Sequence, residues 1–299
     1  LDDQAETLVM ALARGAGIDG LSAMQPKTEL NGLTIVRPFL EITRAQLRAT
    51  LSRAGASWVE DPTNRDTAYE RVRVRDALKL LEKEGVSCAG LARSSRRLSR
   101  ARAALAHAAD ALSRDAVIHE VSGFARIMRQ PFFRAPDEIQ LRCLLAATRT
   151  YGGGMAQSLA GAEGLLDWMQ AGTGKARTFA GCRIVRRSAE FIIGREGERI
   201  SEAPVQIEPG QCVADWDRRY HISISRGADP VELMVLHDVD EKLLPVRPKL
   251  VPDFVWQGLP VAISAGNQVI MPGEGRQPGP QDQQNVMFHL IAGAKTAQT

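Results

Sequence analysis

Arginine side chains gather in one part of the sequence, and their chemistry suits them to phosphate. Residues 71–102 hold ten basic and three acidic side chains, a net charge of +7, whereas the whole chain has a formal net charge of only +3. A guanidinium holds a phosphate through two parallel hydrogen bonds, so this segment predicts a surface for RNA or a nucleotide. The alternative is a solvated helix face in a protein whose genome favours arginine codons.

Within this segment, Arg71 and Arg75 are four residues apart, so a helix would bring both guanidinium groups to one face. Arg73 falls on another face and is the weaker candidate. Further along, four arginines lie within eight residues and are candidates for contact with RNA phosphates: Arg93, Arg96, Arg97 and Arg100.

A second group of candidate side chains is acidic and lies at the start of the sequence. The run LDDQAET, residues 1–7, places Asp2, Asp3 and Glu6 near the N-terminal end of a helix that the following apolar spacing predicts. Two local explanations compete with a functional one. An aspartate can cap the helix, and a carboxylate in the first turn stabilises it by about 0.3–1 kcal/mol. Thr7 is expected to bond back to the preceding turn.

The elements that must position these side chains form an α/β pattern. The first helix is expected to end at Gly15, and residues 32–40 predict a buried strand. Thr43 with Gln46 forms a capping-box sequence that opens a second helix. Residues 57–64 predict a short strand that runs into a turn. In that turn, side chains of the Asp61 and Asn64 type often only hold the backbone, and we favour this structural role for both.

The rest of the chain divides into a helical region and a β-rich region. The pattern is helical and basic from residue 69 to about 119, and further helices are predicted at 136–152 and 158–172. Residues 176–196 alternate apolar and polar side chains around a turn, which predicts a hairpin. From residue 200 onward, short strands alternate with Pro and Gly, and this part has a net charge of −4.

Four sequence features occur together in a fixed order. They are LDDQAET at 1–7, RG at 14–15 followed by a glycine at 17, RP at 37–38, and EDPTN followed by YERVRVR between 60 and 75. This series resembles the tRNA(Ile)-lysidine synthase family, a branch of the PP-loop ATP pyrophosphatases. Members of that family typically show a DDQ-x-E-T helix, then a D-x-S/T-N segment and an R-x-x-x-R stretch. Val72 departs from the pattern, because many members have Asn at that place.

The resemblance implies an order of domains that agrees with the pattern along the chain. It implies the α/β remnant of a PP-loop domain, of the adenine nucleotide alpha-hydrolase-like fold, then a helical middle domain and a small β-rich C-terminal domain. The corresponding boundaries are residues 1–80, 81–198 and 199–299.

The resemblance also implies a reaction. Enzymes of this family join lysine to C2 of the wobble cytidine in the isoleucine tRNA that carries a CAU anticodon. ATP first adenylates the C2 oxygen, and the ε-amine of free lysine then displaces AMP. The implied protein is a carbon–nitrogen ligase that uses ATP with Mg²⁺, free L-lysine and tRNA(Ile), and has no bound metal or prosthetic group of its own.

Matching the family's motifs residue by residue assigns the candidate site. The residues expected to be catalytic are Asp3, Glu6, Arg71 and Arg75. Those expected to bind ATP, its magnesium ion or lysine are Asp2, Asp3, Gln4, Glu6 and Arg14. Those expected to bind tRNA are Arg71, Arg73, Arg75, Arg93, Arg96, Arg97 and Arg100. For Gln4 the local alternative is an exposed first-turn residue, and for Arg14 it is a solvated side chain that complements the helix dipole.

One feature of the PP-loop enzymes has no match in these residues. Those enzymes carry an S-G-G-x-D-S phosphate-binding loop after their first strand, whereas YGGGMAQS at 151–158 follows a helix and has no acidic residue after its glycines. We therefore expect the chain to begin inside the ATP-binding domain and to form little or no lysidine by itself. Its sheet would have an uncovered edge, which is compatible with a homodimer.

Cysteine usage and hydropathy narrow the remaining classes of protein. The four cysteines form no CxxC pair, which favours free thiols in a reducing cytoplasm over zinc or disulfides, and no apolar run is long enough for a membrane helix. Scattered cysteines also argue against a tRNA thiolase, another PP-loop class, as distinct from a GMP-synthase-like amidotransferase. Two alternatives stay open: an RNA-binding remnant without catalysis, and a β-rich interaction module with an unrelated basic arm.

Aromatic side chains beyond residue 200 have two explanations. Trp216, Tyr220, His221 and Trp256 could stack on bases of a tRNA. Aromatic residues in short strands more often fill a core, and we expect that role for Trp256 and for Trp168.

Overall fold

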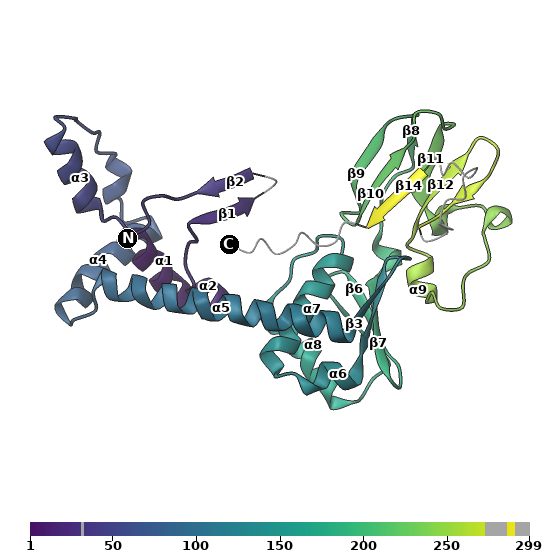
Figure 1. The fold of residues 1–299 in the computed structure, drawn as a ribbon, viewed down its shortest axis with the longest axis horizontal. Helices are drawn as coiled ribbons and strands as arrows, with labels where there is room; N and C mark the ends of the chain where they lie inside the picture. The colour runs from purple at the N-terminus through teal and green to yellow at the C-terminus, as the bar shows by residue number, and fades with distance from the viewer. Residues whose placement is uncertain (31–32, 273–285, 291–299) are drawn as a thin grey trace. The chain divides into compact units, whose positions relative to one another are not determined.

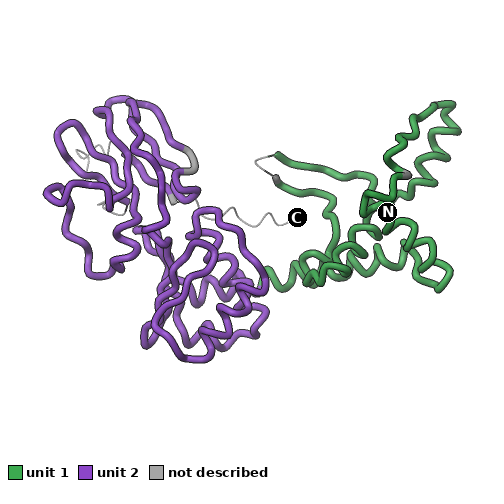
Figure 2. Tube along the Cα trace, turned by 180° about the vertical axis from the view of Figure 1, so that it is seen from behind, with its two compact units in different colours: residues 1–107, 297–299 green, residues 108–296 purple. Residues whose placement is uncertain are grey.

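The computed structural model describes residues 1–30, 33–272 and 286–290. The chain forms two compact units (Figure 2), which we call unit 1, residues 1–107, and unit 2, residues 108–296. Both contain helices and strands, so the mixed α/β content expected from the sequence is confirmed. The finer division into three domains stays a prediction.

Unit 1 is mostly helical (Figure 1). Its elements are α1 (Asp2–Ala13), α2 (Ile18–Leu21), β1 (Lys27–Leu30), β2 (Leu33–Val36), α3 (Arg44–Arg53), the 3-10 helix η1 (Pro62–Arg65), α4 (Glu70–Lys83) and the first part of α5 (Cys88–Ala116). Helix α1 packs against α4 and α2 and buries Ala5 and Leu8. The predicted end of α1 is confirmed, since Gly15 follows it with a φ of +65°, a conformation that glycine adopts at little cost.

The sequence prediction for helix α3 holds in detail. The Thr43 hydroxyl accepts a hydrogen bond from the backbone N–H of Gln46 at 3.1 Å, and the Gln46 side chain accepts one from the backbone N–H of Thr43 at 2.8 Å. This reciprocal capping box fixes where α3 begins. It therefore also fixes the position of Arg44, the first residue of the helix.

Two strands predicted for unit 1 differ from the structure. The strand expected at 32–40 is short, covers Leu33–Val36, and leaves both of these end residues largely exposed, 71% and 64%. It pairs antiparallel with β1, a polar strand whose sequence gave no signal. Residues 57–64 form no strand: irregular backbone runs into η1, where Asp61 Oδ1 accepts from the backbone N–H of Thr63 at 2.9 Å. Pro62 cannot donate to a sheet, and the Asp61 bond supports the predicted turn role.

The first part of unit 2 is a five-stranded antiparallel sheet with helices (Figure 1). The strand order is β3-β4-β7-β6-β5, with bounds Val117–Glu120, Phe124–Met128, Glu190–Arg195, Cys182–Arg186 and Ala176–Phe179. The helices are α6 (Arg129–Arg134), α7 (Asp137–Tyr151) and α8 (Leu159–Ala171), of which the last two were predicted. The predicted hairpin is β6 and β7, extended by β5. The helical prediction to residue 119 is wrong at its end, because β-branched Val117 and Ile118 pair with β4 instead.

The second part of unit 2 is β-rich, as predicted. One sheet has the order β14-β10-β9 and the other β13-β12-β11-β8. In chain order the bounds are β8 Val205–Ile207, β9 Cys212–Trp216, β10 Tyr220–Ile224, β11 Val231–Val235, β12 Pro260–Ser264, β13 Val269–Ile270 and β14 Val286–Leu290. Short helical turns join them: η2 (Gly197–Arg199), η3 (Leu236–Asp238), η4 (Glu241–Leu243) and α9 (Asp253–Trp256).

The aromatic residues of unit 2 belong to its cores. Trp216 and Tyr220 are 3% and 1% exposed, so stacking on bases is wrong for these two. Trp256 packs against a second apolar cluster, as predicted. Trp168 is half-buried beneath the guanidinium of Arg186, 4.5 Å from its carbon to the ring centre.

Two further expectations concern the chain as a whole. All four cysteines are free thiols. Across residues 1–30, 33–272 and 286–290, no helix combines the length and the apolar character needed to cross a bilayer.

Candidate active site

A pocket of about 530 Å³ in unit 1 brings most of the predicted site residues together. Helix α1, the start of α3, the η1 turn and the first turns of α4 form its walls. Its lining residues are Asp3, Glu6, Met10, Arg44, Thr63, Asn64, Tyr69, Glu70, Arg71, Val72 and Arg75. We call it the acid–arginine pocket. Its members come from two sequence segments about 60 to 70 residues apart and from one residue, Arg44, that the sequence analysis did not select.

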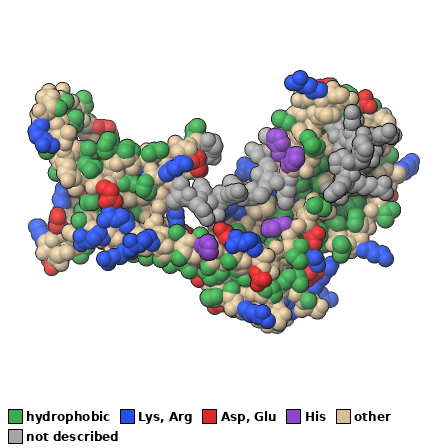
Figure 3. Space-filling view, in the orientation of Figure 1, with side chains coloured by type: hydrophobic (Ala, Val, Ile, Leu, Met, Phe, Trp, Pro, Cys, Tyr) green, Lys and Arg blue, Asp and Glu red, His purple; other side chains and the backbone are tan. Residues whose placement is uncertain are grey.

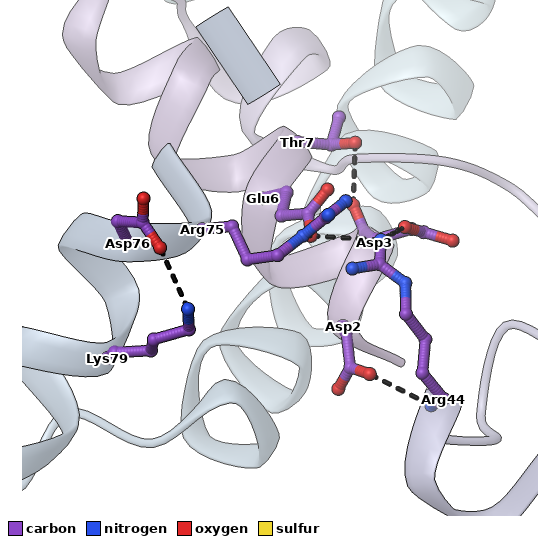
Figure 4. A network of polar contacts seen from close by, with 8 residues as sticks. All are labelled: Asp2, Asp3, Glu6, Thr7, Arg44, Arg75, Asp76 and Lys79. Carbon is purple, nitrogen blue, oxygen red and sulfur yellow. Dashed lines mark hydrogen bonds and ion pairs between the residues drawn. The ribbon is translucent and has the colours of Figure 1, made fainter. Parts of the chain in front are cut away.

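Glu6 is the most deeply placed of the predicted acids, only 1% exposed. Its Oε1 accepts a hydrogen bond from Arg75 Nε at 2.9 Å and pairs with Arg44 Nη2 at 2.9 Å (Figure 4). Its Oε2 is buried and has no hydrogen-bond partner. A buried carboxylate oxygen without a donor is costly and uncommon in native proteins, so it indicates a place for a further donor.

Asp2 and Asp3 hold the start of α3 rather than the start of α1. Asp2 Oδ2 accepts from the backbone N–H of Arg44 at 2.9 Å, and Asp3 Oδ1 pairs with the Arg44 guanidinium. No side chain caps α1, whose N-cap residue is Leu1, so the local explanation of either aspartate as its cap is wrong. Asp3 lines the acid–arginine pocket, and Asp2 does not. The prediction for Thr7 is confirmed, since its hydroxyl donates to the Asp3 carbonyl at 2.7 Å.

Gln4 and Arg14 lie outside this pocket. The Gln4 amide is buried, donates to the Met24 carbonyl at 2.8 Å and accepts from the Met24 backbone N–H at 2.9 Å. The alternative of an exposed first-turn residue is therefore wrong, and the contacts give Gln4 a role in the fold. Arg14 pairs with Glu70 at the start of α4. That ion pair, between largely exposed groups, links α1 to α4.

The arginines of α4 divide by what they touch. Arg71 and Arg75 both line the pocket, as their spacing predicted. Arg75 is committed to Glu6, whereas Arg71 is exposed and makes no ion pair or hydrogen bond with any residue that the structure describes. Arg73 points elsewhere and donates to the carbonyls of Thr67 and Ala68, at 2.7 and 2.8 Å. Arg71 is thus the cation that remains available to a ligand, and Val72 is a buried core residue beside it.

Arg44 is the site residue that sequence reasoning missed. It lies in a run with Arg48 and Arg53, and nothing in its spacing separates it from them. In the structure it bridges Asp3 and Glu6. Burial disfavours its charged form, but the carboxylates of Glu6 and Asp3 outweigh this and raise the pKa of Arg44 above its ordinary value. The guanidinium is therefore held as a cation between two acids.

The arginines of α5 form a separate basic surface. Basic side chains gather over the N-terminal half of α5 in Figure 3. Arg93, Arg97 and Arg100 are exposed and have no ion pair among the described residues, whereas Arg96 pairs with Glu41. Arg96 and Arg100 also border a second pocket of unit 1, about 490 Å³, which Gln4 lines as well. The three unpaired arginines fit contact with phosphates better than Arg96 does.

The donor set of the acid–arginine pocket fits a nucleotide that carries magnesium. Carboxylate oxygens such as those of Asp3 and Glu6 are the ligands that Mg²⁺ prefers, and a guanidinium such as that of Arg71 suits a phosphate. Within the described ranges, no group of three or more His, Cys, Asp and Glu side chains is arranged to hold a metal ion by itself.

Comparison with known proteins agrees with the motif series. Residues 1–81 match the model of the PP-loop domain. The tRNA(Ile)-lysidine synthase of Ruegeria pomeroyi is 34% identical over 265 residues, 87% of this chain and 59% of that protein. The chain is a relative of the tRNA(Ile)-lysidine synthases. The enzyme of the same name from Bradyrhizobium diazoefficiens is 42% identical over 165 residues, 50% of this chain and 44% of the relative, and that from Wolbachia pipientis is 32% identical over 75% and 52%.

These findings confirm the resemblance seen in the sequence. The chain spans about half the length of the curated tRNA(Ile)-lysidine synthases that it matches. The acid–arginine pocket lies wholly within the residues that match the PP-loop domain. The arginines of α5 lie beyond that match.

Proposed function

We propose that the protein is a tRNA(Ile)-lysidine synthase, a ligase that uses ATP to join L-lysine to C2 of the wobble cytidine in isoleucine tRNA with a CAU anticodon. The observation that carries this proposal is the acid–arginine pocket. There a buried glutamate with one unpartnered oxygen faces an arginine without a protein partner. This is the combination that an ammonium and a phosphate would complete.

The chemistry assigns the two sides of the pocket different tasks. ATP, with Mg²⁺, supplies the adenylate that turns the C2 oxygen of the base into a leaving group. The ε-amine of lysine then forms the new carbon–nitrogen bond, the carbon–oxygen bond breaks, and AMP leaves. Asp3 and Glu6 accept hydrogen bonds from the incoming ammonium or hold the magnesium ion, and Arg71 stabilises the negative charge that grows on the departing phosphate. Arg75 keeps Glu6 in place.

The basic surface of α5 suits the second substrate. Arg93, Arg97 and Arg100 occupy positions i, i+4 and i+7 of one helix, so they lie along one face over two turns. Their guanidinium groups would contact successive phosphates of the tRNA and would orient it without reading its sequence. The free thiols and the RNA substrate favour a cytoplasmic enzyme. A homodimer stays a prediction.

The proposal is tested by the reaction itself. The full-length protein is incubated with ATP, Mg²⁺, L-lysine and a transcript of isoleucine tRNA with a CAU anticodon, and the digested RNA is analysed by mass spectrometry. We expect a cytidine that has gained one lysine at the wobble position, together with one AMP for each lysine joined. A transcript with uridine at that position is the matched control and should gain nothing. Absence of a lysine-dependent product from the active, folded protein would refute the proposal.

A further inference from the structure

We propose that Arg44 is a positioning residue of this reaction: its guanidinium holds Asp3 and Glu6 in the one arrangement that leaves Glu6 Oε2 to a ligand. The inference rests on the proposed function and extends it to a residue outside the recognised motifs. Arg44 touches no reacting atom in this account. It acts through the two carboxylates.

The geometry shows how one residue reaches all three acids of α1. The backbone N–H of Arg44 donates to Asp2 Oδ2, and its Nη2 pairs with both Asp3 Oδ1 and Glu6 Oε1 (Figure 4). Because Arg44 is the first residue of α3, the capping box of that helix sets the direction from which the guanidinium arrives. A separate and locally determined element therefore fixes the acids.

The charges explain why such a residue is needed. Asp3 and Glu6 are three residues apart on one helix, so their carboxylates are neighbours of like charge. Arg44 lies between them and removes the repulsion. Arg44 and Arg75 both approach Oε1 of Glu6, which turns the carboxylate so that Oε2 remains without a donor. Loss of Arg44 would leave Arg75 alone to orient Glu6, and Asp3 free to rotate.

The helix itself supplies a matched control. Arg48, one turn after Arg44 on α3, pairs with Glu60 at 2.6 Å, and both side chains are about half exposed. Arg48 does not line the acid–arginine pocket. Substitution of Arg48 removes the same charge and a surface ion pair from the same helix, but leaves Asp3 and Glu6 untouched.

The experiment compares Arg44→Met, Arg44→Lys and Arg48→Met in the full-length protein. It measures kcat, the KM for lysine and for ATP, and the thermal unfolding midpoint of each variant. We expect Arg44→Met to lower kcat by roughly 10- to 100-fold, since misplacing a reacting group by about 1 Å can cost about 100-fold. Its KM for ATP should change little. Arg44→Lys should restore part of kcat, because it keeps one cation near the acids, and Arg48→Met should match the wild type.

The pH dependence separates positioning from a merely structural role. With the cation gone from between two carboxylates, the acidic limb of the kcat profile should move to higher pH in Arg44→Met, and in Arg48→Met it should not move. The inference is overturned if Arg44→Met keeps wild-type kcat and pH profile. It is also overturned if the two Arg44 variants lose activity only in proportion to a lower unfolding midpoint.

The failure of the proposed function would look different. In that case the wild-type protein itself forms no lysidine. The contact can still be judged then, by urea unfolding of Arg44→Met, Glu6→Gln and the double variant. Non-additive midpoints would support the Arg44 contact with Glu6, and additive midpoints would overturn it.

Discussion

Each unit of this protein contains a buried carboxylate set between two arginines, and the two differ in how they are completed. In unit 2, Asp217 accepts from Arg195 through both oxygens, at 2.9 Å each, and from Arg219 Nε at 2.6 Å. Arg219 is fully buried and also donates to the Gly258 carbonyl. In unit 1, both arginines meet a single oxygen of Glu6, and the other oxygen has no partner.

The difference teaches how the same ingredients serve structure or function. The Asp217 cluster is closed: both carboxylate oxygens have donors, and neither arginine is exposed by more than a few per cent. It also anchors a tight turn, since Asp217 and Arg218 have φ of +45° and +53°. The Glu6 cluster is incomplete and borders a pocket. A polar network left unsatisfied in an otherwise consistent fold is expected at functional sites, where a ligand completes it.

The strongest test of the closed cluster is to remove its charge. Asp217→Asn leaves two buried guanidinium groups without an anion, and breaking such a buried pair costs about 3–5 kcal/mol. We expect the free energy of unfolding of unit 2 to fall by that amount, measured by urea unfolding with the fluorescence of its tryptophans. A loss below about 1 kcal/mol would show that the cluster is not structural.

The next test separates the two pocket arginines that the sequence could not tell apart. Arg71→Ala should lower kcat/KM by about 10- to 100-fold, or about 1.4–2.7 kcal/mol, because it removes the cation beside the departing phosphate. Its stability should stay within about 0.5 kcal/mol of the wild type, since Arg71 has no partner in the described structure.

Arg73→Ala is the matched control for this test. It should lower stability by roughly 0.5–1.5 kcal/mol, because its hydrogen bonds to two carbonyls disappear, and leave kcat/KM nearly unchanged. The reverse pattern, with Arg73 needed for activity and Arg71 dispensable, would contradict the placement of the pocket.

The basic surface of α5 should respond to salt. Replacing Arg93, Arg97 and Arg100 by glutamine should weaken tRNA binding and make the slope of log Kd against log salt shallower by roughly 0.7–0.9 for each phosphate that the variant no longer neutralises. Fluorescence anisotropy at several salt concentrations measures this slope. Glutamine at Arg48 and Arg53, on exposed positions of α3, is the control and should leave the slope alone. An unchanged slope in the α5 variant would assign RNA binding to another surface.

The smallest expected effect uses cysteine as a reporter of the closed cluster. Burial raises the pKa of Cys182 to about 12, and that of Cys143 likewise to about 12, so both thiols stay protonated and shielded at about pH 8. Exposed Cys212 should react with iodoacetamide well before either of them. In Asp217→Asn, Cys182 should gain reactivity, as read by mass spectrometry of the labelled peptides. Equal reactivity of Cys182 and Cys212 in the wild type would contradict this burial.

Local sequence patterns predicted the parts of the site that short-range interactions determine. The α1 acids, the capping box of α3 and the face shared by Arg71 and Arg75 follow from spacing alone. Contacts across long separations gave no such signal. Arg44 meets Asp3 across 41 residues, and Arg75 meets Glu6 across 69.

The errors in unit 1 have the same origin. Gln4 is buried because the Met24 backbone, twenty residues away, brackets its amide. The apolar run of β2 remains exposed because no other described strand of unit 1 than β1 pairs with it. Tertiary partners decided these positions, and neither propensity nor periodicity reports on them.

The central claim is that Glu6 is left incomplete for a ligand while Asp217 is completed by the protein. The most direct measurement is lysidine formation by Glu6→Gln, with urea unfolding of the same sample. The account predicts that kcat/KM falls by at least about 100-fold, or about 2.7 kcal/mol, while the free energy of unfolding falls far less than in Asp217→Asn. Wild-type activity in Glu6→Gln, with a loss of stability equal to that of Asp217→Asn, would contradict it and make Glu6 a second structural carboxylate.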